Sequence, residues 1–238
     1  MEYPHNRPYT ADDLVRIITL LRDPVNGCPW DKVQTHTSIR MNFLEEAYEA
    51  VDALDLDDPV LMCEELGDVL MQVAFHTCME QETGRFTWEQ VCDGVCQKLI
   101  ERHPNIFGTQ PGYEGITDWD ALKNKEKGRR TLADDLESVP RAMPALMRAA
   151  KLQKRAARHG AALQGADPSL LLTGADAAAL ADAAENLQTA QPASAQAEQA
   201  VGKLLFAAAN LARQAGVDPE QALQKANEAF CTAAGPVA

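Results

Sequence analysis

The stretch LEEAYEAVDALDLDDPVLMCEELGDVL, residues 44–70, determines the predicted fold of this chain. Its apolar residues have helical spacing on both sides of an Asp-rich break, which predicts two helices in a hairpin. Each helix carries a pair of acids three residues apart, and residues at this spacing share one helix face. The pairs are Glu46 with Glu49 and Glu65 with Asp68. Four clustered carboxylates repel one another, so we expect a cation among them.

Helical patterns also cover the rest of the chain. Thr10 and Thr87 each begin a capping box, and Asp58 followed by Pro59 is typical of a helix start. No stretch has the alternation of a strand, so we predict an all-α bundle. The helix after Pro59 is apolar on nearly all sides, which predicts that it is buried with its acids facing inward. The predicted helices cover approximately residues 10–23, 41–54, 59–82, 87–103, 118–130, 177–187 and 201–216, and a last one begins at Asp218.

Composition limits the class of protein. With 238 residues, 46% of them hydrophobic, the chain is long enough for one large or two smaller cores. No apolar run is long enough to span a bilayer, and residues 1–10 lack the pattern of a signal peptide. We therefore expect a cytoplasmic protein with no membrane partner. The six cysteines form no CxxC pair and are expected to be reduced core residues rather than zinc or redox sites.

The negative charge is concentrated in the first part of the chain. The net charge is −13, and residues 1–130 contribute −11 of it, with 13 Lys and Arg against 24 Asp and Glu. This acidity argues against a nucleic-acid polymer as partner. An acidic pocket would also repel a polyphosphate until cations reverse its sign, so activity on phosphates should require a divalent metal.

The ligand types indicate which metal to expect. Carboxylate oxygens suit Mg²⁺, with Mn²⁺ as a substitute, whereas zinc sites usually contain His or Cys. A di-iron bundle would use Glu-x-x-His, and neither Glu49 nor Glu65 has a histidine three residues later. Mg²⁺ held by a few carboxylates takes substrate phosphate oxygens as further ligands, which indicates a phosphate ester or anhydride as substrate. The alternative for each single acid is a solvated helix face.

Candidate substrate contacts lie on both sides of the hairpin. Lys98 and Arg102, one turn apart on a predicted helix, could bind phosphates or could be surface bases stabilised by the helix C-terminus. The loop before the hairpin contains Trp30 and His36, side chains suited to recognition. For Trp30, the alternative is that it caps the core.

The second part of the chain has the pattern of a copy of the first. VGKLLFAAANLARQAG at 201–216 has the layout of residues 66–84, and a helix containing LQKANEAF follows it. Ala200 and Lys203 stand at the positions that acids occupy in the first copy. The copy has therefore lost its carboxylates.

Several motifs together resemble one protein family. The chain is similar, over most of its length, to the MazG-type nucleoside triphosphate pyrophosphohydrolases, including their acidic signature EExxE followed by ExxD. The resemblance implies an all-α bundle, dimeric or larger, that hydrolyses NTPs or dNTPs to the monophosphate and pyrophosphate with Mg²⁺. The motifs are GCPWD (27–31), QTHTS (34–38), LEEAYE (44–49), EELGD (64–68), KLIERHP (98–104) and LQKANE (223–228).

The resemblance also implies roles for the candidate residues, in three groups. The Mg²⁺ ligands would be Glu46, Glu49, Glu65 and Asp68. The catalytic residues would be Glu45 and Glu49, with Glu45 holding a second ion or orienting the attacking water. The substrate contacts would be Lys98 and Arg102 to the phosphates, and Trp30 or His36 against the nucleoside.

The second repeat departs from the family pattern. Such repeats commonly carry their own acids, and the positions for them are occupied here by Ala178, Ala179, Ala200 and Lys203. The chain also ends before a full second repeat. We therefore expect a catalytic domain over residues 1–130 and a degenerate, truncated repeat over 131–238 that packs or dimerises. The alternative function is a nucleotide-binding sensor or scaffold with little turnover.

Overall fold

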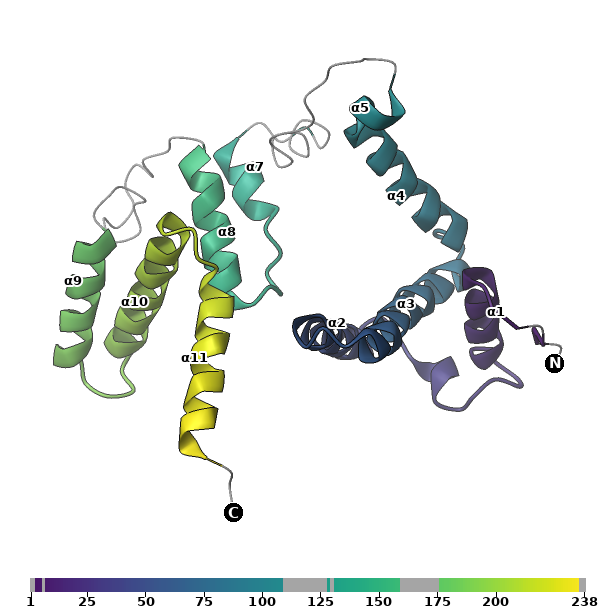
Figure 1. Cartoon of the computed structure of the whole chain (residues 1–238), viewed down its shortest axis with the longest axis horizontal. Coiled ribbons are helices and arrows are strands. Elements are labelled where there is room, and N and C mark those ends of the chain that lie inside the picture. Colours follow the sequence, from purple (N-terminus) through teal and green to yellow (C-terminus); the bar gives the residue numbers. More distant parts are fainter. Residues whose placement is uncertain (1–2, 6, 109–127, 129–130, 159–175, 236–238) are drawn as a thin grey trace. The chain divides into compact units, whose positions relative to one another are not determined.

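The computed structural model describes residues 3–5, 7–108, 128, 131–158 and 176–235 (Figure 1). The chain divides into two compact units, residues 1–116 and 117–238. Every regular element within the described residues is a helix, which confirms the all-α prediction. None of the described helices is both long and apolar enough to cross a bilayer.

The first unit contains the predicted acidic hairpin. Its helices begin where the sequence predicts, because Thr10 and Thr87 form capping boxes and the Asp58 side chain accepts from two backbone N–H groups of the first turn. The elements are α1 (Ala11–Leu21), the 3₁₀ helix η1 (Asp31–Val33), α2 (Arg40–Asp55), α3 (Pro59–Glu82), α4 (Trp88–Arg102) and α5 (Pro104–Phe107).

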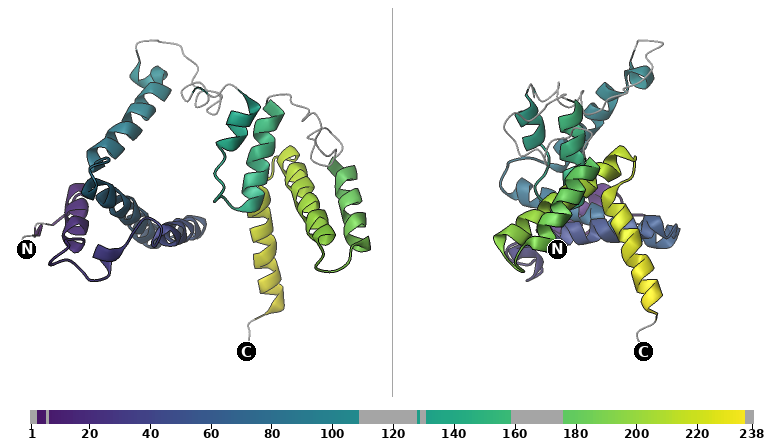
Figure 2. Two further views of the ribbon diagram at one scale, coloured as in Figure 1. Left: turned by 180° about the vertical axis from the view of Figure 1, so that it is seen from behind. Right: turned by 90° about the vertical axis from the view of Figure 1, so that its left-hand side faces the viewer.

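Helix α3 is the centre of this unit, and α1 and α2 both pack on it (Figures 1 and 2). Its C-terminal half supplies most of the core, where Phe75, Cys78 and Met79 pack with Ile18 and Trp88. Burial of these apolar side chains is the main stabilising term of the unit. The core therefore fixes the C-terminal half of α3, and with it the direction in which the N-terminal half projects.

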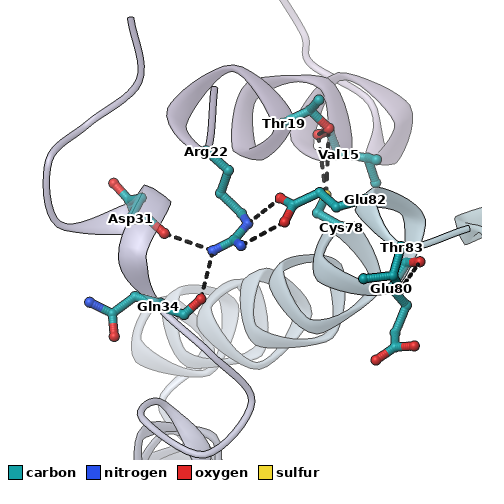
Figure 3. A network of polar contacts seen from close by, with 9 residues as sticks. All are labelled: Val15, Thr19, Arg22, Asp31, Gln34, Cys78, Glu80, Glu82 and Thr83. Atoms are coloured by element: carbon teal, nitrogen blue, oxygen red, sulfur yellow. Dashed lines mark hydrogen bonds and ion pairs between the residues drawn. The ribbon is translucent and has the colours of Figure 1, made fainter. Parts of the chain in front are cut away.

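A buried arginine joins α1, the following loop and the end of α3. The Arg22 guanidinium bonds both oxygens of Glu82 at 2.5 and 2.8 Å, and it donates to the backbone oxygens of Asp31 and Gln34 at 2.7 and 3.2 Å (Figure 3). Arg22 is buried, so each of these bonds compensates for the loss of hydration. The loop before α2 is thereby held against α3.

The expectation that α3 is buried on all sides is wrong for its N-terminal half. Leu66 is 50% exposed and Leu70 is 40% exposed. The reason is that α2 covers only one side of this half. The apolar pattern of the sequence indicates which side chains favour burial, but it does not say which element covers them. Within the described residues of one chain, nothing covers this face of α3.

The second unit pairs α9 with α10, while α8 and α11 pack together and against α10. The predicted helices near 177–187 and 201–216, and the one after Asp218, are confirmed, whereas the helix predicted over 118–130 lies outside the described residues. The interpretation of this unit as a degenerate repeat stays a prediction. Its helices are α7 (Leu132–Glu137), α8 (Ala145–Arg158), α9 (Asp176–Thr189), α10 (Ala195–Gln214) and α11 (Pro219–Ala234).

The cysteines are all free thiols, as expected, but they are not all core residues. Cys78 is buried, whereas Cys63, Cys96 and Cys231 are exposed. Helical position explains the difference, because Cys63 lies on the exposed N-terminal half of α3 and Cys78 on the buried C-terminal half.

Candidate metal centre

Helices α2 and α3 bring together three of the four predicted metal ligands. Glu46 and Glu49 from α2 and Glu65 from α3 each offer a carboxylate oxygen, and these oxygens all lie within 4.8 Å of one another. The i, i+3 spacing on α2 places its two acids on the face that packs against α3. Asp68 lies one turn after Glu65, is half-buried, and is outside this closest group.

Loss of hydration, and then the proximity of the other acids, raises the pKa values of two of these carboxyl groups. Partial burial raises the pKa of Glu46, and the charges of Asp68, Glu49 and Glu45 raise it further, against the lowering effect of a hydrogen bond from Gln72. The pKa of Glu65 is also raised, first by loss of hydration and then by the charge of Glu49. A cation between these carboxylates would relieve both effects, so the donor set fits a divalent metal that prefers oxygen ligands.

Gln72, which the sequence analysis did not select, supports this fit. Its Nε2 donates to Glu46 Oε1 at 3.3 Å, and its own Oε1 is buried without a partner in the described part of the chain. Turning the amide over would place its oxygen against the carboxylate, so the assigned orientation is the favourable one. A buried acceptor without a donor is costly. The amide therefore holds the Glu46 carboxylate in place at a cost in stability, as expected of a side chain that supports a metal ligand.

The other predicted site residues lie outside the close group formed by Glu46, Glu49 and Glu65. Glu45 is exposed on α2, next to Glu46. Lys98 is exposed and Arg102 half-buried, both near the C-terminal end of α4. Helix α4 leaves the end of α3 and extends away from α2 (Figures 1 and 2). One copy of the first unit therefore gathers the carboxylates without these two bases.

Trp30 does not cap the core, because its side chain is 57% exposed. It stands immediately before η1, and its backbone oxygen accepts a hydrogen bond from Gln34 Nε2 at 2.9 Å. The alternative considered for Trp30 is therefore wrong. Its ring is left available for a ligand.

His36 belongs to a polar cluster that joins the loop before α2 to α3. His36 Nε2 lies 2.5 Å from Glu80 Oε1, and its Nδ1 lies 2.7 Å from Nδ1 of His76. Because a carboxylate only accepts, Nε2 of His36 donates to Glu80, and of the two facing Nδ1 atoms of His36 and His76 one donates to the other. Burial, and then the proximity of His36, lower the pKa of His76. Arg85 completes the cluster through an ion pair with Glu80 at 2.6 Å.

Helical spacing was the signal for two α3 residues that are not among the predicted site residues. Gln72 and His76 follow Asp68 at steps of four residues, so they continue the face that carries the acids. Their partners could not be read from this spacing, because His36 is 40 residues away from His76.

Comparison with known proteins identifies the family. Residues 34–107 match the MazG nucleotide pyrophosphohydrolase domain, and this range contains all the predicted metal ligands. A nucleoside triphosphate pyrophosphohydrolase of Escherichia coli is 40% identical over 222 residues, which cover 92% of this chain and 83% of that protein. A nucleoside triphosphate pyrophosphohydrolase/pyrophosphatase MazG of Thermotoga maritima is 38% identical over 219 residues, 92% of this chain and 82% of that protein.

These matches define the class as enzymes that hydrolyse phosphoric anhydrides. The chain belongs to the MazG family of nucleotide pyrophosphohydrolases, as its motifs indicate.

Proposed function

We propose that the protein hydrolyses nucleoside triphosphates, NTPs or dNTPs, to the monophosphate and pyrophosphate in a Mg²⁺-dependent reaction, with its active centre in the first unit. The observation that carries the proposal is the group Glu46, Glu49 and Glu65, whose carboxylate oxygens lie within 4.8 Å of one another inside the region of the family match. The names of the relatives support the reaction.

The metal would be held by the four acids of the hairpin, and Mn²⁺ would substitute for Mg²⁺. Glu46, Glu49 and Glu65 supply the close group, and Asp68 adds a fourth carboxylate from the same face of α3. When bound, the metal lowers the pKa of water and neutralises negative charge on the phosphates. Gln72 fixes the Glu46 carboxylate through its amide hydrogen bond.

Glu45 and Glu49 are the proposed catalytic residues. Glu45 is exposed next to the half-buried Glu46, where its carboxylate can accept a proton from an attacking water. Glu49 is the exposed member of the close group, so it faces both the metal and the entering substrate.

Lys98, Arg102, Trp30 and His36 are the proposed substrate contacts. Lys98 and Arg102 would bind phosphates, and exposed Trp30 offers a ring face to a base. Both ring nitrogens of His36 already face protein groups, so its contribution would come through its ring face or through placement of the loop.

A homodimer or larger homo-oligomer is part of the proposal. Exposed apolar side chains lie on the N-terminal half of α3 and on α4, and a second copy would remove them from water. They include Leu66, Leu70, Val95 and Leu99. A partner could also bring the bases of α4 to the acids of α2 and α3. A cytoplasmic location stays part of the proposal.

The second unit is proposed to be noncatalytic. Ala200 is buried and Lys203 is half-buried, and neither can replace a carboxylate ligand. Within the described ranges, the only group of three or more metal-ligating side chains is the one in the first unit.

A panel of NTPs and dNTPs assayed for pyrophosphate and monophosphate, with Mg²⁺ and with EDTA, tests the proposal. Pyrophosphate as first product, lost in EDTA and unaffected by Lys203→Ala, would support it. Orthophosphate as first product would indicate an ordinary NTPase. Tight Mg²⁺-dependent nucleotide binding without product would support the alternative, a sensor or scaffold.

A further inference from the structure

The second unit contains a basic cavity that the proposed reaction does not use. It has a volume of about 590 Å³ and lies where the C-terminal part of α10 and the start of α11 meet α8. Its lining consists of Met147, Ala150, Lys151, Lys154, Arg213, Gly216, Val217, Asp218 and Pro219. We propose that this cavity binds a phosphate-bearing small molecule, pyrophosphate or the phosphate group of a nucleotide, directly and without a metal ion.

Three bases converge on the cavity, and no acid in the described part of the chain forms an ion pair with them. Within the described residues, neither Lys151 nor Lys154 has a carboxylate within ion-pair distance. Arg213 donates through Nε to the neutral Asn210 Oδ1 at 2.9 Å, which leaves its two terminal nitrogens for a ligand.

The one acid in the lining is already engaged. Asp218 caps α11, and its Oδ1 accepts from the backbone N–H groups of Glu220 and Gln221, each at 3.0 Å. Asp218 keeps its charge, but the three bases of α8 and α10 outnumber it, so the described lining is net positive.

The walls of the cavity are held together by specific bonds. Glu220 Oε2 accepts from the backbone N–H of Met147 at 3.2 Å, which joins α11 to the first turn of α8. Gln153 is buried, and its Nε2 donates to the backbone oxygen of Phe206 at 2.7 Å, which joins α8 to α10. The bases are therefore mounted on helices whose relative positions are fixed, as preorganised binding requires.

The chemistry of the lining selects the class of ligand. Lysine and arginine side chains bind phosphate oxygens through charge-assisted hydrogen bonds. Met147, Ala150 and Val217 provide an apolar wall suited to a nucleoside, and the volume is in the range of small-molecule sites. The acidic group of the first unit has the opposite sign, so it needs a cation to hold phosphate whereas this cavity does not. The inference goes beyond the proposed function and uses none of its residues.

Binding in EDTA separates the two sites. We would titrate the full chain with pyrophosphate, AMP and ATP by calorimetry in EDTA, which prevents metal-dependent binding at the first unit. The expected result is saturable binding of about one ligand per chain, with the double variant Lys151→Gln/Lys154→Gln weakening it about tenfold or more. If nucleotides bind more tightly than pyrophosphate, the apolar wall contacts the nucleoside. If the affinities are equal, the cavity recognises the phosphate group alone.

A matched control removes two exposed bases of the same unit outside the cavity, Arg141→Gln/Lys225→Gln. It should change affinity less than twofold, and thermal unfolding should show that both double variants fold. Absence of saturable binding in EDTA, equal weakening by both double variants, or binding restricted to nucleic-acid polymers would each overturn the proposal. If the wild-type chain binds these ligands in EDTA but shows no Mg²⁺-dependent hydrolysis, that result would count against the proposed function alone.

Discussion

Replacement of Gln72 by leucine should weaken metal binding while leaving the stability of the metal-free protein nearly unchanged. The substitution removes the amide that donates to Glu46 Oε1 at 3.3 Å, a bond to a charged group that contributes about 1.5 kcal/mol at the low end of its range. It also removes the buried Oε1 that has no partner in the described residues, which raises the free energy of unfolding by about 1–3 kcal/mol. The two terms nearly offset each other in the free energy of unfolding.

Metal affinity should respond differently, because the substitution removes the amide that holds the Glu46 carboxylate in its proposed ligand position. Loss of such a supporting group costs about 10- to 100-fold in affinity. The assay is Mn²⁺ binding by electron paramagnetic resonance on the nucleotide-free full chain, with urea unfolding of the same sample in EDTA.

Gln97→Leu is the matched control for Gln72→Leu. Gln97 makes the same type of bond, Nε2 to Asp93 Oδ2 at 2.6 Å, on the exposed surface of α4. It should leave the Mn²⁺ dissociation constant unchanged. Equal Mn²⁺ affinity in wild type and Gln72→Leu, or a Gln72→Leu protein destabilised by more than about 2 kcal/mol, would refute the reasoning.

Two further predictions concern pH and stability. Since burial and neighbouring charges raise the pKa values of Glu46 and Glu65, the metal-free protein should lose stability as pH rises through these values, above the ordinary 4.5. The measure is the difference in melting temperature between the wild type and the double variant Glu46→Gln/Glu65→Gln, in EDTA from pH 4 to 7, because the lowered pKa of His76 adds a rise that is common to both proteins. Relative to the double variant, the wild type should lose stability as pH rises, and a difference that does not change with pH would contradict the assignment. Mn²⁺ affinity should fall as protons compete at low pH. Arg22→Met should destabilise by about 3 kcal/mol in urea, because the bonds of the buried guanidinium to two backbone carbonyl oxygens are lost, whereas Glu82→Gln, at a 45% exposed side chain, should cost less than about 1 kcal/mol. Equal costs for the two variants would show that the ion pair, and not the bonds to the loop, is the stabilising element.

The sequence was sufficient to predict most of the helices, though not α5, α7 or α8, and the three members of the close carboxylate group. Helical periodicity and helix capping depend only on residues close together in the sequence. The helix starts at Thr10, Asp58 and Thr87 could therefore be predicted without knowledge of the tertiary fold. The i, i+3 spacing likewise fixes a shared helix face. Because a short connection joins α2 and α3 into a hairpin, the two acidic faces lie against each other. This explains why Glu49 and Glu65 lie in one close group, as predicted.

What covers each helix face could not be predicted in the same way. Leu66 and Leu70 are apolar but exposed in one copy of the chain, because burial depends on which element lies opposite. The exposure of Trp30 and the pairing of His36 with His76 also depend on tertiary contacts between distant segments. The positions of Lys98 and Arg102 follow from the direction of α4, which no periodic pattern encodes.

The most direct test of the central claim is pyrophosphate release from NTPs in Mg²⁺ by Glu49→Gln, compared with Asp52→Asn. Glu49 belongs to the close carboxylate group, whereas Asp52 is an exposed acid one turn later on the same helix. Glu49→Gln should lower kcat/KM at least about 100-fold, and Asp52→Asn should change it less than about threefold. Undiminished pyrophosphate release by folded Glu49→Gln protein would contradict an active centre in the first unit.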